Sequence, residues 1–388
     1  METRINERRV ALFVYYGWIS ISPSLVSTIK LLNENGYLVD IIYLYNKKFG
    51  YYKPALSNVR SIYVTSHKIR FLTPFKFIID CYNITKSYAY DLFVGVDQEG
   101  IIAAGILSIL RNIPYIYYSL EILAKEDIAK RKGGKKYLWN ILKIMESYFN
   151  RKAIATIVQD EYRAKILIKD NLINERKIYL IPNSYYFEGK NIEIMRYNIE
   201  VPLDKKIIIY VGSIVQEVAI KEILSHINLW PRDTVMIIHA PNRSSYLEEV
   251  EQIIKQNNIK NKIYISIKRL TFDELCNLIR KADIGISFYK SVDKNTELAC
   301  SGKVSFYLSQ GIPIIINDVS PQSKELVSKY KCGICVNSSE DVGEAIRVIF
   351  KSYSKFSRNA KVAYGQELDF KKHFNNILEV IAKTAIKE

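Results

Sequence analysis

The sequence predicts an α/β protein made of two doubly wound domains, and two observations support this fold class. Short, almost wholly apolar runs alternate with segments of helical periodicity along most of the chain, which is typical of parallel sheets covered on both faces. A polar stretch at 188–204, which contains Gly189 and Pro202, interrupts this alternation near the middle of the chain. A chain of 388 residues is long enough to build two separate cores.

The first domain is expected to span residues 1–187 and to begin with a nearly all-apolar strand, Val10–Tyr15. A turn at 16–18 follows, and a helix with one apolar side runs over 24–35. Strand–helix repeats of this kind favour parallel strands joined by right-handed crossovers. The further strands expected in this domain are Leu38–Tyr45, Ser61–Thr65, Asp91–Val96, Pro114–Tyr118, Ala153–Val158 and Lys177–Ile181.

The alternation restarts after the polar stretch, so we interpret 188–204 as a linker and 205–366 as a second Rossmann-like domain. A last helix is expected within 367–388, and it could pack back on the first domain. Ligands of such sheets bind outside the carboxyl ends of the strands, which predicts a binding cleft between the two domains. The strands expected in the second domain are Lys206–Val211, Thr234–His239, Lys262–Ile265, Asp283–Phe288, Ile314–Ile316 and Gly333–Val336.

Composition favours a protein of a reducing compartment. No apolar run approaches the roughly 18 residues of a spanning helix, and residues 1–15 lack a signal-peptide core, so we expect a cytoplasmic protein. The five cysteines are few and odd in number. Cys332 and Cys335 have the spacing of a redox or zinc pair, but no second pair or nearby His completes a site. We therefore predict buried free thiols and no metal site.

The net charge of +16 is large enough to attract an anionic partner. Its densest part is a run of five basic residues within seven positions, with no acid among them. Such a partner could be nucleic acid, an acidic membrane surface or a phosphorylated substrate. The five basic residues are Lys130, Arg131, Lys132, Lys135 and Lys136.

Aromatic side chains, including Trp139, follow this basic run directly. Basic residues beside aromatic ones favour an anionic membrane surface that presents a lipid-linked acceptor, and the alternative is a solvated loop made mobile by Gly133 and Gly134. Five apolar residues spaced for one face of the following helix are predicted to face the core. They are Leu138, Ile141, Leu142, Met145 and Phe149.

The segment Ser301, Gly302 and Lys303 is predicted to open a short helix that ends at Gly311. A helix N-terminus offers backbone N–H groups and the positive end of a dipole to an anion, and Lys303 would add a full charge. The alternative is an ordinary crossover with a solvated lysine.

Residues Lys303 to Pro313 resemble a segment of GT-B glycosyltransferases, close to family 4, in which a lysine precedes Glu-Tyr-Leu and Gly-x-Pro. Three more stretches are similar to family segments: Ile181–Ser184, Tyr210–Ile214 and Leu270–Tyr289. A longer stretch, Glu146–Asn183, is similar to the family's succession of helix, strand, short helix and turn. The resemblance extends over nearly the whole chain, with these segments in the family's order. The resemblance implies the GT-B fold, with the acceptor in the first domain and a nucleotide sugar in the second.

The sequence departs from the family at four positions. Phe306 stands where the family has the acid that holds the donor ribose, and Ser213 and Val218 replace its Arg and Lys. Tyr118–Glu121 is similar to the family's Asp-Ser-His-Glu stretch but has Leu120 in place of the histidine. GT-B enzymes work without a divalent ion, so the resemblance also implies that lysines neutralise the leaving diphosphate.

Most of the predicted donor-binding residues follow strands or open the helix at 302. Glu297 is added because the resemblance implies it, since it lies one residue from the position of the family's other glutamate. The backbone after a strand-ending glycine can approach a phosphate closely, which favours Gly212, although a plain strand-to-helix turn is the alternative. The full set is Gly212, Ser213, His239, Asn242, Lys268, Glu297, Ser301, Gly302 and Lys303.

On the acceptor side, Asp97 ends a strand and is predicted to deprotonate an acceptor hydroxyl, the alternative being a helix N-cap. Glu121 is predicted to bind the acceptor or to orient Asp97, the alternative being a surface glutamate. Gly17 and Trp18, in the turn after the first strand, are predicted to face the acceptor.

We therefore predict a cytoplasmic glycosyltransferase, peripheral at the inner face of the membrane, that moves a sugar from a nucleotide diphosphate to a polyprenyl-linked or polysaccharide acceptor in cell-surface glycan synthesis. No cofactor is expected beyond the donor. The alternatives are a nucleotide-sugar epimerase on the same fold and a catalytically degenerate partner subunit. Sugar transfer to DNA is not favoured, because no groove-reading element is visible and it would require steeply salt-dependent duplex binding.

Overall fold

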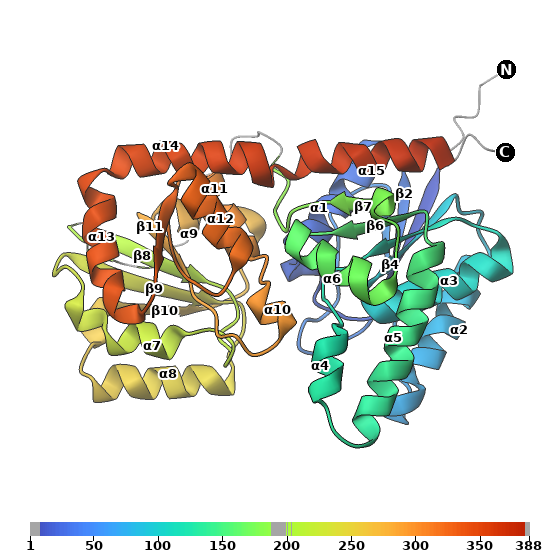
Figure 1. Cartoon of the computed structure of the whole chain (residues 1–388), viewed down its shortest axis with the longest axis horizontal. Helices are drawn as coiled ribbons and strands as arrows, with labels where there is room; N and C mark the ends of the chain where they lie inside the picture. Colours follow the sequence, from blue (N-terminus) through green and yellow to red (C-terminus); the bar gives the residue numbers. More distant parts are fainter. Residues whose placement is uncertain (1–7, 188–198, 200, 203, 385–388) are drawn as a thin grey trace. The chain divides into compact units, whose positions relative to one another are not determined.

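A computed structural model describes residues 8–187, 199, 201, 202 and 204–384. The chain divides into two compact units, one formed by residues 1–186 with 370–388 and the other by residues 187–369. Each unit contains one parallel sheet with helices on both faces (Figure 1). This confirms the predicted class of two doubly wound α/β domains. Most of the predicted linker, 188–204, lies outside the described residues.

The sheet of the N-terminal unit has seven strands in the order β3-β2-β1-β4-β5-β6-β7, and every described pairing is parallel. The chain steps outward from β1 to β2 and β3, and then returns to the other side of β1 with β4. The strand order therefore reverses between β1 and β4. The strands are β1 (Arg9–Val14), β2 (Leu38–Leu44), β3 (Val59–Val64), β4 (Leu92–Val96), β5 (Tyr115–Tyr118), β6 (Ala155–Val158) and β7 (Ile178–Leu180).

Helices cover both faces of this sheet because its strands are apolar on both sides. The last helix, α15, packs with α1 on one face and contributes Phe370, Phe374 and Ile377 to that core. Helices α2, α3 and α5 pack on the other face, around Phe13 and Phe93. The helices are α1 (Pro23–Glu34), α2 (Thr73–Thr85), α3 (Asp97–Arg111), α4 (Lys125–Lys130), α5 (Gly134–Lys152), α6 (Glu161–Asn171) and α15 (Phe370–Thr384).

The sheet of the C-terminal unit has six parallel strands in the order β10-β9-β8-β11-β12-β13. Its strand order reverses between β8 and β11, in the same way as in the first unit. The strands are β8 (Lys206–Val211), β9 (Thr234–Ala240), β10 (Ile263–Ile267), β11 (Ile284–Ser287), β12 (Ile314–Asn317) and β13 (Gly333–Val336).

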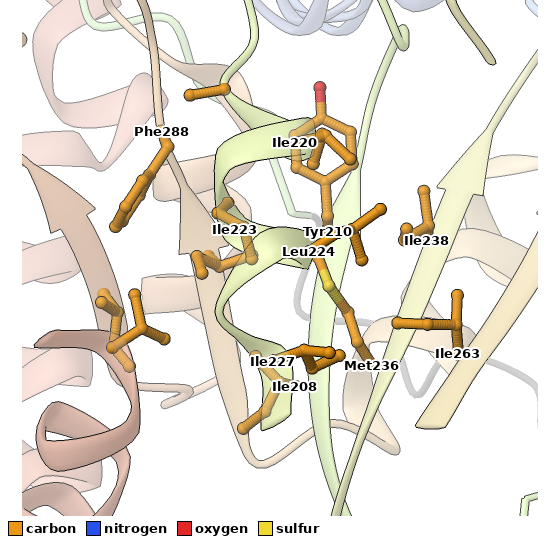
Figure 2. Packing of buried hydrophobic residues seen from close by; sticks show 14 of the residues in the cluster. Ile208, Tyr210, Ile220, Ile223, Leu224, Ile227, Met236, Ile238, Ile263 and Phe288 are labelled. Atoms are coloured by element: carbon orange, nitrogen blue, oxygen red, sulfur yellow. The ribbon is translucent and has the colours of Figure 1, made fainter. Parts of the chain in front are cut away.

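The core of the C-terminal unit is rich in isoleucine. Figure 2 shows Ile208 and Tyr210 of β8 beside Met236 and Ile238 of β9, with the short helix α7 lying over them. The apolar side of α7 supplies Ile220, Ile223 and Leu224 to this core. The helices are α7 (Ile220–Ser225), α8 (Ser245–Gln256), α9 (Phe272–Arg280), α10 (Lys294–Glu297), α11 (Gly302–Ser309), α12 (Pro321–Tyr330), α13 (Val342–Lys351) and α14 (Tyr353–Ala363).

The prediction that five apolar residues of α5 face the core is wrong for the first two, Leu138 and Ile141. Leu138 and Ile141 are more than half exposed. The interior instead receives Lys143 and Glu146, whose charged groups lie 3.0 Å apart, and the hydroxyl of Tyr117 donates to Glu146 Oε1 at 2.6 Å. A buried ion pair is stable when its charges are paired and hydrogen-bonded, so α5 can rotate part of its apolar face outward.

Candidate active site

The C-terminal unit brings three segments to the point where its strand order reverses. Gly212 follows β8, Tyr289 follows β11, and Gly302 opens α11, so that Lys303 lies in the first turn of that helix. In doubly wound sheets a reversal of this kind is where ligands bind, outside the carboxyl ends of the strands.

Lys303 is held at this point by hydroxyls and aromatic rings. Its Nζ donates to the hydroxyl of Tyr289 at 2.7 Å and to Ser301 Oγ at 3.3 Å. The same ammonium lies 4.5 Å from the ring centroid of Tyr289 and 5.2 Å from that of Tyr210. Aromatic faces attract a cation without neutralising it. The lysine is therefore oriented by neutral groups and keeps its full charge for an anion.

Tyr289 is fixed from both its backbone and its hydroxyl. The side chain of Asn317 accepts from the Tyr289 amide at 3.1 Å and donates to its carbonyl oxygen at 2.6 Å. Burial alone would raise the pKa of Tyr289, but the charge of Lys303 and the hydrogen bonds with Lys303, Ser301 and Ser287 lower it overall. The pKa of Tyr289 thus reports the positive field at this site.

Gly212 permits the close approach of Lys303 to the strand end. The φ angle of Gly212 is +143°, and a Cβ atom there would lie 3.3 Å from Lys303 Cε and 3.4 Å from the Tyr210 hydroxyl. A side chain would crowd both groups, and residues other than glycine rarely adopt this φ. The structure thus supplies a local reason for glycine at this position.

Ser301 is the N-cap residue of α11, but its hydroxyl does not cap the helix. It lies 3.2 Å from the Tyr289 hydroxyl and 3.4 Å from Ser287 Oγ. The first turn of a helix has N–H groups without partners within the helix, at the positive end of its dipole. One ammonium, several hydroxyls and a helix N-terminus therefore converge, which is the chemistry of an anion site.

The remaining predicted donor-binding residues differ in their surroundings. His239, at the end of β9, is buried and lies 2.9 Å from Ser266 Oγ, and burial lowers the pKa of His239 to about 4. Asn242 and Lys268 lie on exposed loops, where Lys268 Nζ is 3.4 Å from Glu274. Glu297 lies on α10 and accepts from Ser291 and Lys294 at 3.0 and 2.6 Å. A hydrogen bond joins Lys303 to Ser301, and the Gly212 amide donates to the carbonyl oxygen of His239 at 3.0 Å.

The positions that depart from the family have structural roles of their own. Ser213 is exposed, and its carbonyl accepts from the Tyr210 hydroxyl at 2.7 Å. Val218 is buried and forms an isolated antiparallel bridge with Tyr289. Lys221, on α7, pairs with Glu249. Lys303 is therefore the candidate cation that the structure places at the reversal point.

Phe306 lies in an aromatic cluster rather than in a polar site. It is buried on α11, stacks on Phe272 with ring centroids 5.8 Å apart, and lies 5.6 Å from the ring of Phe187. A carboxylate in this position would be desolvated among aromatic rings. Phe306 itself therefore offers no carboxylate to a ribose.

The N-terminal unit has its own reversal point, between β1 and β4, and Asp97 lies there. It follows β4 directly, is buried, and has a φ of +55°, an unusual backbone conformation for a residue other than glycine. Its Oδ1 accepts hydrogen bonds from the amides of Leu120 and Glu121 at 2.7 and 2.8 Å, and both of these residues follow β5. Asp97 is thus not the N-cap that the alternative interpretation expected, because its side chain joins two loops.

Burial raises the pKa of Asp97 well above its ordinary value, and the charge of Glu121 adds to the rise. The two amide hydrogen bonds oppose this rise. The side chain of Glu121 is exposed. Glu121 holds Asp97 through its backbone amide. A carboxyl group with a raised pKa is suited to accepting a proton near neutral pH.

Two aromatic residues and Gly17 accompany Asp97 at this point. The rings of Tyr16 and Trp18 stack with centroids 3.8 Å apart. The Tyr16 hydroxyl is buried and has no hydrogen-bond partner among the described residues, and burial followed by the charges of Asp97 and Glu121 raises its pKa. At Gly17 a Cβ atom would lie only 3.0 Å from the Cβ of Asn46. A buried hydroxyl near a carboxyl group suits an acceptor that carries hydroxyls.

The predicted membrane residues lie at the junction of α4 and α5. Lys130 pairs with Glu126 at 3.1 Å and Asp127 at 3.8 Å, and the guanidinium of Arg131 lies 4.5 Å from the ring of Trp139. Of the helices that the structure describes, none has both the length and the apolar character needed to cross a bilayer. Lys132, Lys135 and Lys136 lie on the same segment.

Sequence reasoning missed Tyr289, Ser287 and Tyr16. All three lie at or just beyond the carboxyl end of a strand that borders a reversal point, which is the signal that could have found them. They were overlooked because tyrosine is frequent in this chain, with 29 residues, and serine is chemically unspecific. Within the described part of the chain, no group of three or more His, Cys, Asp or Glu side chains is arranged to hold a metal ion.

Comparisons with known proteins address the fold and part of the sequence. Residues 241–369, a third of the chain, match the family model described as the C-terminal domain of glucosyltransferase 3-like proteins. No curated protein sequence matches the chain.

Solved structures that are similar over nearly the whole chain include the following three. A sucrose-phosphate synthase from Thermosynechococcus elongatus has a TM-score of 0.71 at 13% identity, covering 97% of this chain and 99% of its own. Anabaena HepE in complex with UDP and glucose has the same score and identity, covering 97% and 100%. A putative UDP-N-acetylglucosamine 2-epimerase from Listeria monocytogenes scores 0.62 at 11% identity, covering 97% and 96%.

At these identities the structural likeness establishes the fold, and the similar structures include both a sucrose-phosphate synthase and a putative epimerase. The resemblance predicted from the sequence segments is confirmed at this level. The chain therefore has the GT-B fold, and its residues 241–369 are similar to the C-terminal domain of glucosyltransferase 3-like proteins.

Proposed function

We propose that this GT-B protein is a glycosyltransferase that moves a sugar from a nucleotide-diphosphate sugar, with UDP as the favoured nucleotide, to a hydroxyl of a lipid-linked or polysaccharide acceptor. The observation that carries the proposal is the site around Lys303, where an ammonium, hydroxyls and a helix N-terminus converge at a strand-order reversal. A leaving diphosphate needs donors that are already oriented toward it. HepE, a structure similar to this chain, has been solved with UDP.

The N-terminal reversal point would supply the acceptor half of the reaction. The bond between the anomeric carbon and the diphosphate oxygen breaks, the acceptor oxygen bonds to that carbon, and Asp97 takes the acceptor proton. The raised pKa of Asp97 suits this proton transfer. The buried Tyr16 hydroxyl and the stacked Trp18 would bind the acceptor glycan. An acceptor in a cell-surface glycan pathway and a position at the inner membrane face belong to the same proposal.

Ligand-dependent thermal unfolding tests the donor site. A ligand that binds only the native state raises the melting temperature with its concentration. We expect UDP and UDP-glucose to raise it, and UMP and inorganic phosphate to raise it less, because a diphosphate offers more acceptor oxygens to Lys303 and the amides of α11 than a single phosphate does. No shift with any nucleoside diphosphate would contradict the proposal.

Product analysis with labelled UDP-sugars then separates the candidate functions. Release of UDP with label in an acceptor, or in free sugar when no acceptor is present, indicates transfer. Conversion of the nucleotide sugar to its 2-epimer would indicate the epimerase, which the likeness to the Listeria protein keeps as a candidate. Binding without turnover would indicate a catalytically degenerate partner subunit, which the family cations missing at Ser213 and Val218 favour.

A further inference from the structure

Two helices of the N-terminal unit expose rows of large apolar side chains. On α2 and the short 3-10 helix before it (Arg70–Leu72), the row follows an i, i+4, i+8 spacing, and on α5 it follows i, i+4, i+7 with one added neighbour. Each of these side chains is between 56 and 74% exposed. Together they form the α2–α5 surface: Phe71, Phe75, Ile79, Tyr137, Leu138, Ile141 and Ile144.

These side chains do not belong to the hydrophobic core, which other residues of the same helices already fill. The inner side of α2 already packs Phe77 and Cys81 into the core, and α5 contributes Phe149 there. On α5 the usual pattern is partly inverted, since Lys143 and Glu146 are buried while Ile141 and Ile144 are exposed. Contiguous exposed apolar residues on a folded unit indicate a surface that something covers.

The two rows belong to one side of the unit. Helices α2 and α5 both pack on α3, on the same face of the sheet, as Figure 1 also shows. Each helix precedes a parallel strand, β4 or β6, so each begins at the carboxyl edge of the sheet. The first turns of both helices, with Phe71, Phe75, Tyr137 and Leu138, therefore lie at the edge that also holds Asp97.

The charges around this surface are mainly positive. The basic run from Lys130 to Lys136 directly precedes the apolar row of α5, and Lys68 and Arg70 precede that of α2. The acids of these segments are engaged: Asp80 pairs with Lys76, Glu126 and Asp127 pair with Lys130, and Glu146 is buried on Lys143. Apolar rows beside a surplus of cations complement a partner with an apolar interior and an anionic surface.

We propose that the α2–α5 surface docks on an anionic lipid bilayer. The apolar side chains would enter the boundary between headgroups and acyl chains, and the basic residues would face the lipid phosphates. Tyrosine and tryptophan are enriched at this depth, which suits Tyr137 and Trp139. As a route to a lipid-linked acceptor this proposal rests on the proposed function, but the binding itself needs neither donor nor catalysis.

Flotation of the full-length protein with vesicles tests the proposal. We expect co-flotation with phosphatidylcholine vesicles that contain phosphatidylglycerol and much weaker flotation with phosphatidylcholine alone. A Lys132→Gln, Lys135→Gln, Lys136→Gln variant should partition on the order of 100-fold less, at about fivefold for each basic residue. A Phe71→Ser, Phe75→Ser variant and an Ile141→Ser, Ile144→Ser variant should each lose on the order of tenfold or more.

A matched control is available on α3. Ile109 and Leu110 are exposed to the same degree, but they lie at the end of α3, at the opposite edge of the sheet. An Ile109→Ser, Leu110→Ser variant should float like the unchanged protein. All variants alter exposed side chains, so their melting temperatures should stay within a few degrees of the unchanged protein.

Three outcomes would overturn the proposal. The first is no flotation of the unchanged protein with anionic vesicles. The second is an equal loss in the α3 control. The third is a change from dimer to monomer in the apolar variants with unchanged flotation, which would assign the surface to a second copy of the chain. The UDP-induced rise in melting temperature, measured without lipid, tests donor binding. It therefore tests the proposed function independently of these three outcomes.

Discussion

The reversal points of the two sheets share a topology and differ in chemistry. In the N-terminal unit the chain places a buried carboxyl group, Asp97, beside the Tyr16 hydroxyl. In the C-terminal unit it places the Lys303 ammonium in a frame of tyrosine and serine hydroxyls. At Asp97 the hydrogen-bond donors are two backbone amides, and at Lys303 the acceptors are neutral oxygens.

This difference shows that one supersecondary plan can present two kinds of chemistry at the same topological position. A carboxyl group whose pKa is raised by burial can take a proton from a hydroxyl. An ammonium held only by neutral groups keeps its charge for an anion. If the comparison is correct, changes at Asp97 should impair turnover without donor binding, and changes at Lys303 should impair donor binding.

The largest effect is expected from Asp97→Asn. The asparagine side chain can still accept the amides of Leu120 and Glu121 and tolerates the same backbone conformation, so the fold should persist. Loss of the proton acceptor should lower sugar transfer about 100-fold or more. The UDP-induced rise in melting temperature should not change.

Stability gives an independent check on Asp97. Because the folded protein raises the pKa of Asp97, ionisation of this group destabilises the fold as pH rises above the ordinary carboxyl range. The amide of an asparagine carries no charge, so Asp97→Asn should match or exceed the unchanged protein in melting temperature at neutral pH. Asp91→Asn, which alters a carboxylate that accepts the Arg9 amide at 2.6 Å, is the matched control and should leave transfer intact.

The next effect is expected from Lys303→Gln. A charge-assisted hydrogen bond contributes about 1.5–3 kcal/mol, so UDP affinity should fall about 10- to 150-fold in calorimetry. Lys324→Gln, which removes an exposed lysine paired with Asp318 in the same unit, should change UDP affinity little. Equal losses in the two variants would mean that the general charge of the unit, rather than the Lys303 site, attracts the nucleotide.

The fold and part of this comparison could be predicted from the sequence. Apolar runs indicate strands because a parallel strand that is buried on both faces carries apolar side chains on both sides. The alternation of such runs with helices then gives the order of elements along the chain. Gly212, Ser301 and Lys303 could be found because strand ends and helix starts can be located without knowing any contact. Tyr289 also follows a strand, but a tyrosine in such a place usually belongs to the core, so the position alone does not distinguish it.

The exposure of the apolar residues at the start of α5 could also not be predicted, and the reason is different. Leu138 and Ile141 have the spacing of a core face, and the buried pair of Lys143 and Glu146 that displaces them depends on Tyr117, which is distant in the sequence. Periodicity counts apolar residues, but it does not reveal which charged residues will find partners inside.

A smaller effect is expected from Tyr289→Phe, which keeps the ring beside Lys303 and removes the hydroxyl. Loss of one hydrogen bond that positions the ammonium should lower UDP affinity about fivefold. In the unchanged protein, UDP affinity should also fall on the alkaline side, because the lowered pKa of Tyr289 lets a phenolate form there and compete for Lys303. Tyr289→Phe should lack this component, and an unchanged alkaline profile in the variant would contradict the role of Tyr289.

The smallest effect on the donor is expected from His239→Asn. Burial lowers the pKa of His239 to about 4, so the imidazole is neutral between about pH 6 and 8 and adds no second cation to the site. The affinity for UDP should therefore be nearly flat across this range once the titration of UDP itself is subtracted, and His239→Asn should shift it less than Tyr289→Phe does. A rise in UDP affinity toward pH 6 that His239→Asn abolishes would show that the imidazole binds the diphosphate as a cation.

The same shift in pKa predicts a loss of stability in acid. The unfolded chain takes up a proton at His239 near the ordinary value of 6.5, whereas the folded protein does so only near 4. Stability from this group is therefore complete above 6.5 and falls by roughly 3 kcal/mol as the pH approaches 4. Denaturant titrations of the unchanged protein and of His239→Asn at both ends of this range measure the difference. An equal acid loss in both would mean that the pKa of His239 is the same in the folded and the unfolded chain, so that the folded imidazole becomes a cation near the ordinary value of 6.5.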